Sequence, residues 1–175
     1  MKFYLRFQFV VVTSLFLAGC GGGGGGTSVS QPTSTAVVYS ISDIFGNLTS
    51  ASSSISGIQV TSTLPRGVSP NVTAGRILRI GNSDLKSLKG NAGIQFGTYS
   101  ATTNQVTFLV TANPITANIG FGEFARLTYT TTLSTPPTLA DFRAQPLLVK
   151  VSGPNAVDLS GKVAAEVGLT TYISP

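Results

Sequence analysis

The chain has 175 residues, with no histidine, no tryptophan, one cysteine and six carboxylates. Histidine alone titrates near neutral pH without tuning, so its absence excludes Ser/His triads, Cys/His dyads and the usual zinc and iron ligand sets. Charged residues are 10% of the chain, against roughly 25% in ordinary soluble domains. We therefore predict a non-enzymatic protein with no cofactor.

The basic side chains are scattered, although the formal net charge is +5. A nucleic-acid-binding surface would need a basic stripe or cluster. The densest basic stretch runs from Arg76 to Lys89 and is predicted to be a solvated edge. No nucleic-acid partner is expected.

Residues 1–19 have the organisation of a secretory signal peptide. Lys2 and Arg6 form a short basic region, which the apolar run FVVVTSLFLA follows. This run is shorter than the roughly 20 residues that span a bilayer, but it has the length of a signal-peptide core. We interpret the segment as a leader that directs export.

The last residues of this leader and the sole cysteine resemble the lipobox of bacterial lipoproteins: Leu17, Ala18, Gly19 and Cys20. The resemblance implies that Cys20 carries diacylglycerol and that cleavage occurs just before it. Several acyl chains would anchor the protein stably to a membrane. A buried thiol is the alternative for Cys20, but the six glycines that follow disfavour it. Glycine after the cysteine resembles outer-membrane lipoproteins, which face the periplasm or the cell surface.

Residues 20–35 are rich in glycine, serine and threonine and have almost no apolar surface. This composition predicts a flexible, disordered linker. The folded domain is expected over residues 36–175, where about 140 residues can bury a core without disulfides.

The first half of this domain alternates apolar with small or polar residues, which predicts short strands. We expect a first strand around Val37, Tyr39 and Ile41, and a second with Ile58, Val60, Ser62 and Leu64 on one face. A third strand is predicted over residues 76–80. Residues 83–90 are predicted to form a helical turn or a loop.

The alternation sharpens after residue 90. Ile94, Phe96 and Thr98 are predicted to share one strand face, with Gln95, Gly97 and Tyr99 on the opposite one. A turn at 101–104 would lead into a partner strand with Val106, Phe108 and Val110 on one side, so the pair predicts a hairpin.

Three further alternating sets follow: Ala125, Leu127 and Tyr129; Leu147, Val149 and Val151; and Val163, Ala165, Val167, Leu169, Thr171 and Ile173. A turn is predicted at 158–162, just before the last set. Seven to nine strands with frequent turn signals predict an all-β protein, in which two antiparallel sheets form a β-sandwich of the jelly-roll or immunoglobulin-like kind.

The segment GFGEFARLTYTTT, residues 120–132, resembles a cohesin strand, with Gly122, Phe124, Ala125, Leu127 and Tyr129 in register. ISGIQVTSTLP at 55–65 resembles an early cohesin strand, and TLADFRA at 138–144 with NAVDLSGKVAAEV at 155–167 resembles the late strand, turn and final strand. The resemblance is to the cohesin and carbohydrate-binding-module superfamily.

This resemblance implies a cohesin-like domain that binds without chemistry, either polysaccharide or a partner surface protein such as one bearing a dockerin. The alternative is a structural or assembly lipoprotein of an outer-membrane or surface-appendage complex. A glycosidase would need two paired carboxylates, whereas the six here stand singly and suit turns and surfaces: Asp43, Asp84, Glu123, Asp141, Asp158 and Glu166.

Tyr99 is the one aromatic residue singled out for stacking on a ligand, because alternation places it on the predicted wetted face. The tyrosine ring there can cover the apolar face of a sugar while its hydroxyl forms a hydrogen bond with the sugar. The alternative is a cross-strand pair that stabilises the sheet. Asp158 is expected to bond backbone amides in its turn, and Asp141 to do so at the start of a strand.

Overall fold

The computed structural model describes residues 33–46, 48 and 54–173, and most of these lie in β-strands. The only α-helix among them has five residues. The elements are β1 Thr33–Asp43, β2 Gly57–Thr63, β3 Val68–Ser69, β4 Val72–Thr73, β5 Leu78–Ile80, β6 Leu85–Ser87, β7 Ala92–Ser100, β8 Gln105–Ala112, β9 Gly122–Thr128, β10 Thr130–Thr131, α1 Leu139–Arg143, β11 Leu147–Ser152 and β12 Val163–Ile173. Short 3-10 helices cover Pro154–Ala156 and Ser160–Lys162.

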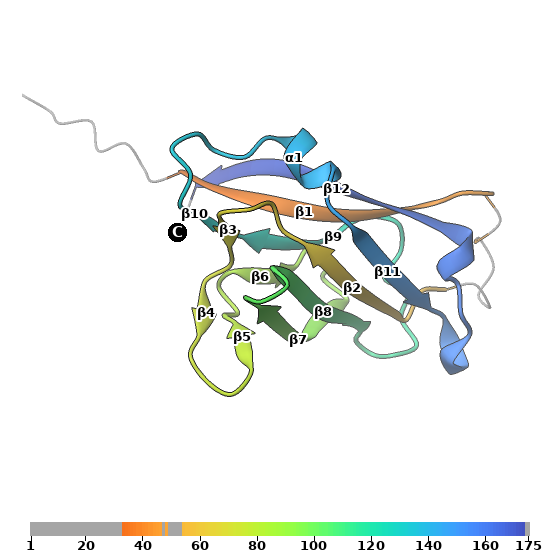
Figure 1. The fold of residues 1–175 in the computed structure, drawn as a ribbon. Coiled ribbons are helices and arrows are strands. Elements are labelled where there is room, and N and C mark those ends of the chain that lie inside the picture. The colour runs from red at the N-terminus through yellow and green to blue at the C-terminus, as the bar shows by residue number, and fades with distance from the viewer. Residues whose placement is uncertain (1–32, 47, 49–53, 174–175) are drawn as a thin grey trace, which may run out of the picture. The chain divides into compact units, whose positions relative to one another are not determined.

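The strands form two main antiparallel sheets (Figure 1). Sheet A has four strands in the order β12-β1-β9-β6, and sheet B has six in the order β11-β2-β8-β7-β5-β4; β10 and β3 pair separately. The predicted all-β sandwich is confirmed. The described residues contain 12 strands rather than seven to nine, because β3, β4 and β10 are two-residue pairings that no alternation reveals.

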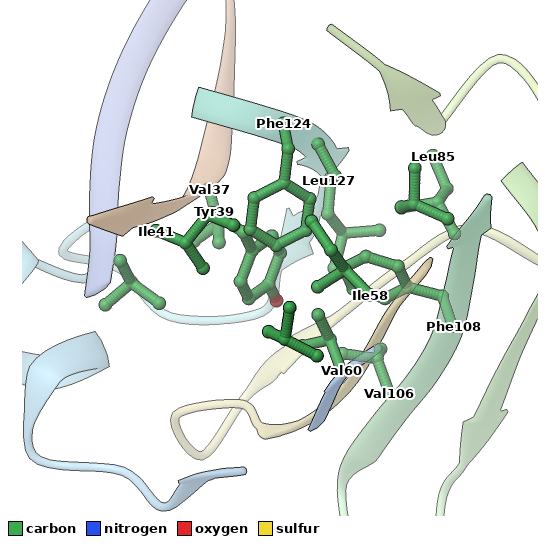
Figure 2. Packing of buried hydrophobic residues seen from close by; sticks show 14 of the residues in the cluster. Val37, Tyr39, Ile41, Ile58, Val60, Leu85, Val106, Phe108, Phe124 and Leu127 are labelled. Carbon is green, nitrogen blue, oxygen red and sulfur yellow. The ribbon is translucent and has the colours of Figure 1, made fainter. Parts of the chain in front are cut away.

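One hydrophobic core lies between the sheets (Figure 2). Val37, Tyr39 and Ile41 enter it from β1, and the predicted inward faces of β2 and β8 meet them from sheet B. The Tyr39 and Phe108 rings join the two sheets in an edge-to-face contact with 5.1 Å between centroids, a geometry that aromatic quadrupoles favour. Period-two alternation therefore identified the core face of these strands correctly.

β1 begins at Thr33, so residues 33–35 belong to the strand and not to the predicted linker. Each of them has a Cα partner in β12, in a ladder that runs without a register shift from Thr33 to Asp43. This pairing, which composition does not show, extends the strand. The leader, the lipobox residues Leu17, Ala18 and Gly19, and Cys20 lie outside the described residues.

Two short segments differ from the sequence prediction. Residues 85–87 form a strand, β6, which pairs with β9 and buries Leu85 opposite Leu127. The third predicted strand begins at Leu78 rather than at residue 76. In both cases pairing with a distant strand decides the local backbone, and three-residue strands carry too little alternation to be recognised.

The segment TLADFRA contains helix α1, although its resemblance to a cohesin strand implied otherwise. Thr138 and Asp141 form a capping box: the Asp141 amide donates to Thr138 Oγ1 over 3.3 Å, and the Thr138 amide donates to Asp141 Oδ2 over 2.7 Å. This reciprocal pair satisfies backbone donors that a helix start leaves open. Asp141 thus caps a helix rather than a strand.

A β-bulge in β7 overturns the predicted placement of Tyr99. Ile94 pairs with Val110 and Phe96 pairs with Leu109, so Gln95 is one extra residue in the ladder. After the bulge the alternation is reversed. Phe96 consequently points outward and is 44% exposed, while Tyr99 is half-buried and packs against the core. The prediction that Tyr99 lies on the wetted face was wrong.

Candidate functional site

The outward side of sheet B presents a broad, mostly uncharged surface. It is built by outward residues of β11, β2, β8 and β7, and we call it the outer sheet face; its members are Gln59, Thr61, Phe96, Thr98, Thr107, Leu109, Leu148 and Lys150. Their inward neighbours along the same strands fill the core. The face therefore follows from the alternation of β-strands.

One row of this face crosses four strands. Lys150 pairs with Gln59, Gln59 with Leu109, and Leu109 with Phe96. Neighbouring strands lie about 4.8 Å apart, so the row is roughly 14 Å long. It combines an ammonium and an amide at one end with an exposed aromatic ring at the other, the mixture that binds molecules with both apolar and hydroxylated faces.

A second, parallel row consists largely of threonines. Thr61 pairs with Thr107, and Thr107 with Thr98. The Thr61 and Thr107 hydroxyls are 3.3 Å apart, and the Thr98 hydroxyl donates to the Thr107 carbonyl over 3.4 Å. These cross-strand bonds hold the hydroxyls in place. This row of threonines lies beside Phe96 on the outer sheet face.

The face deepens into a cavity of about 460 Å³ beside the loop that follows β11. Gln59, Leu109 and Lys150 line it from the sheet, and Ala156 and Asp158 line it from the loop. Its volume is within the range of small-molecule sites. The sheet thus supplies a flat surface that ends in a concave one.

The loop wall of this cavity has unusual backbone geometry. Asn155 and Ala156 have φ values of 56° and 61°, a region that costs a non-glycine residue of order 1 kcal/mol. Asp158 Oδ1 accepts a bond of 2.9 Å from the Ser160 amide, so its predicted turn role is confirmed. Hydrogen bonds from Ser160, and to a smaller extent the charge of Lys150, lower the pKa of Asp158.

Tyr99 lies away from the outer sheet face. Its hydroxyl donates to Asn104 Oδ1 over 2.6 Å, and burial raises its pKa. It lines a shallow hollow with Leu64, Arg66 and Asn104.

In the sheet, Tyr99 stands opposite Val106 and Leu78, a cross-strand position on the core side. Sequence reasoning did not single out Phe96, which is the exposed aromatic residue of β7. The bulge before Phe96 reverses the alternation of β7, and the sequence pattern alone does not show where a bulge lies.

The carboxylates of the described residues mainly organise local backbone. Asp43 accepts bonds from the amides of Phe45 and Leu48, both 2.9 Å long, while Asp141 and Asp158 cap their segments. Within residues 33–46, 48 and 54–173, no cluster of three or more His, Cys, Asp or Glu has the arrangement of a metal site. Across the same ranges, none of the helices has the length and apolarity to traverse a bilayer.

Comparison with known proteins gives no relative: neither a protein-family model, a curated protein nor a solved structure matches this chain. The candidate site consequently rests on its own geometry.

Proposed function

We propose that the protein is a non-enzymatic lipoprotein, anchored through Cys20 in the outer membrane, whose β-sandwich binds polysaccharide on the outer sheet face. The observation that carries the proposal is the exposed Phe96 ring beside Leu109, in one row with Gln59 and Lys150. An aromatic ring can cover a sugar's apolar face, while neighbouring amides and hydroxyls bond its hydroxyl groups.

The lipid anchor in this proposal rests on the lipobox resemblance alone. Replacing Cys20 with alanine should abolish incorporation of labelled palmitate and leave the uncleaved precursor. Labelling that persists in the Cys20→Ala protein would contradict the anchor without touching the ligand site, because the two features are in different parts of the chain.

A glycan array probed with the purified protein tests the ligand, followed by calorimetry with the strongest hit. Phe96→Ala should weaken binding roughly fivefold, since aromatic packing contributes about 1 kcal/mol. Phe45→Ala is the matched control, because Phe45 is 63% exposed but follows β1 and lies outside the outer sheet face. Tyr99→Phe should also leave binding intact. Equal losses in Phe96→Ala and Phe45→Ala would refute this site.

A second candidate function, assembly with a partner surface protein, is favoured by the loops at one end of the sandwich. The loops after β1, β8 and β11 each cross between the sheets, and backbone bonds tie them to neighbouring segments, as from Ile44 to Lys162 over 3.1 Å and from Ile119 to Ile55 over 2.8 Å. They expose large apolar side chains: Ile44, Phe45, Ile115, Phe121 and Val157. Exposed apolar clusters often mark protein contacts.

The same two variants separate these functions. If the protein acts in assembly, Phe45→Ala should reduce the amount of a specific co-purifying protein while Phe96→Ala does not, and the glycan array should show no binding.

A further inference from the structure

The row of threonines on the outer sheet face continues beyond β7 to the edge of sheet B. Arg79 of β5 pairs with Thr98, and Thr73 of β4 pairs with Arg79. Ile80, the next residue of β5, is buried. Because successive side chains of a strand point to opposite faces, Arg79 points outward, to the side of the sheet that carries Phe96.

Arg79 lies within reach of the Phe96 ring. It stands directly opposite Thr98, and Phe96 is two residues from Thr98 on the same face of β7. Diagonal neighbours of this kind lie about 7 to 8 Å apart, a distance that long and aromatic side chains can span. A sugar ring that covers Phe96 would therefore bring its substituents close to a guanidinium group.

The edge of the face at β4 and β5 (Figure 1) also forms a second hollow, of about 290 Å³. Thr73, Arg76, Ile77 and Arg79 line it, together with residues 74 and 75. The inward residues of β4 and β5 are not part of its lining, so the hollow opens on the outward side of sheet B. It is lined by two arginines and by no carboxylate.

Nothing in the neighbouring strands neutralises these two arginines. The six strands of sheet B, all within the described ranges, contain no aspartate or glutamate. The carboxylates that lie in strands belong to sheet A: Asp43, Glu123 and Glu166. Asp158 borders the outer sheet face only at its opposite end, in the cavity that Lys150 also lines. The edge at β4 and β5 is therefore the positively charged end of the face.

The spacing of the cations in sheet B favours a polymer over a small anion. Lys150 of β11 lies four strand spacings from Arg79 of β5, which is roughly 19 Å. Phe96 and the threonine row lie between them. A chain of sugars can follow this path, whereas one small anion can contact only one end of it.

We propose that the polysaccharide bound by the outer sheet face is acidic and consists at least partly of uronic acid units. This inference rests on the proposed polysaccharide site and specifies the class of polymer. One sugar ring covers Phe96, and a carboxylate of that unit or the next accepts hydrogen bonds from Arg79, with Arg76 beside it. A guanidinium is suited to this role because its parallel N–H groups match the two oxygens of a carboxylate.

Calorimetric titration with fragments of polygalacturonate and polymannuronate, and with their methyl esters, tests the proposal. The esters keep the sugar rings and remove the charge. At low salt we expect the acids to bind roughly fivefold more tightly than the esters, because an exposed ion pair contributes up to about 1 kcal/mol. The difference should shrink in about 0.5 M salt, which screens exposed charges. Acids and esters that bind equally at low salt would overturn the proposal.

Variants locate the charge that makes this distinction. Arg79→Gln should remove most of the preference for the acids and leave the affinity for the esters unchanged. Arg143→Gln is the matched control, because Arg143 is also exposed but lies in α1, outside the outer sheet face. An equal loss of preference in both variants would mean that only net charge matters and would overturn the assignment. Thermal unfolding of each variant shows that it is folded.

Phe96→Ala distinguishes failure of this inference from failure of the proposed function. It should weaken the binding of acids and esters to the same extent. Binding of uncharged glycans that depends on Phe96 but shows no preference for acids would retain the polysaccharide site and overturn its acidic specificity. No binding of any glycan would reject both. Arg79-dependent binding to phosphatidylglycerol vesicles, without binding of the acids, would assign the hollow to lipid headgroups instead.

Discussion

Asn104, at the end of the turn between β7 and β8, connects two separate parts of the fold. Its φ of 52° is in the left-handed region, which asparagine tolerates better than most residues. Its amide nitrogen donates to the carbonyls of Leu64 and Pro65 over 2.9 and 3.0 Å, and its oxygen accepts from Tyr99. One side chain thus joins the β7–β8 hairpin to the end of β2.

Asn104→Ala should lower the free energy of unfolding by roughly 2 to 4 kcal/mol, because it removes these hydrogen bonds and places a Cβ-bearing residue without compensation at positive φ. Urea denaturation measures the change. Asn104→Gly also loses the bonds but accepts the backbone conformation, so its loss should be smaller. Alanine and glycine variants as stable as the natural protein would contradict the account.

At the scale of the element, a single irregularity decides which side chains a strand or helix turns toward the core. The β7 bulge reverses the strand's alternation and brings Gly97 to the inner side, where a Cβ would collide with the Leu85 side chain. Glycine there leaves room for β6 against β7. In α1, the capping box starts a helix of only five residues, and it places Phe142 against the core.

The capping box leads to a prediction about how stability depends on pH. Hydrogen bonds from the Thr138 amide and hydroxyl lower the pKa of Asp141 below its ordinary value. The folded protein therefore favours the ionised carboxylate. Its contribution to stability is fully present above the unfolded-state pKa of about 3.9, and it disappears as the pH falls through the lower folded-state pKa. The Asp141→Asn protein should melt below the natural protein near neutral pH, and the difference should vanish in acid.

Thermal melts across this pH range provide the measurement. Thr138→Ala should reduce the same pH-dependent difference, since it removes one of the two donors. A constant difference between Asp141→Asn and the natural protein at every pH would show that the carboxylate charge does not matter.

At the scale of the whole molecule, the two sheets meet in one hydrophobic core. Phe108 is completely buried, packs against Tyr39 and sits in the middle of sheet B, while Phe96 is on the adjacent strand but faces outward. These two phenylalanines have the same chemistry and opposite surroundings.

Phe108→Ala should destabilise the fold by about 3 to 5 kcal/mol through lost burial and the cavity it leaves. Phe96→Ala should cost less than about 1 kcal/mol, because an exposed side chain loses little on truncation. Denaturant unfolding compares the two. Similar costs would mean that β7 continues its alternation without the bulge.

Much of the fold was predictable from residue order. The alternation in β2, β8 and β12 identified strands and core faces, because a strand half buried in a sandwich repeats every two residues. The candidate site was only partly predictable: a wetted face was expected on the strand that became β7, but its aromatic residue was assigned to Tyr99 rather than Phe96.

The sequence by itself determined the class of architecture and the positions of most long strands, since these depend on local periodicity and turn residues. The leader and lipobox are likewise local patterns and remain predictions. Only the tertiary structure decided the bulge in β7, strand β6 and the extension of β1 to Thr33. The physical reason is that these features arise from pairing and packing between distant segments, whose contacts outweigh the weak local preferences of a few residues.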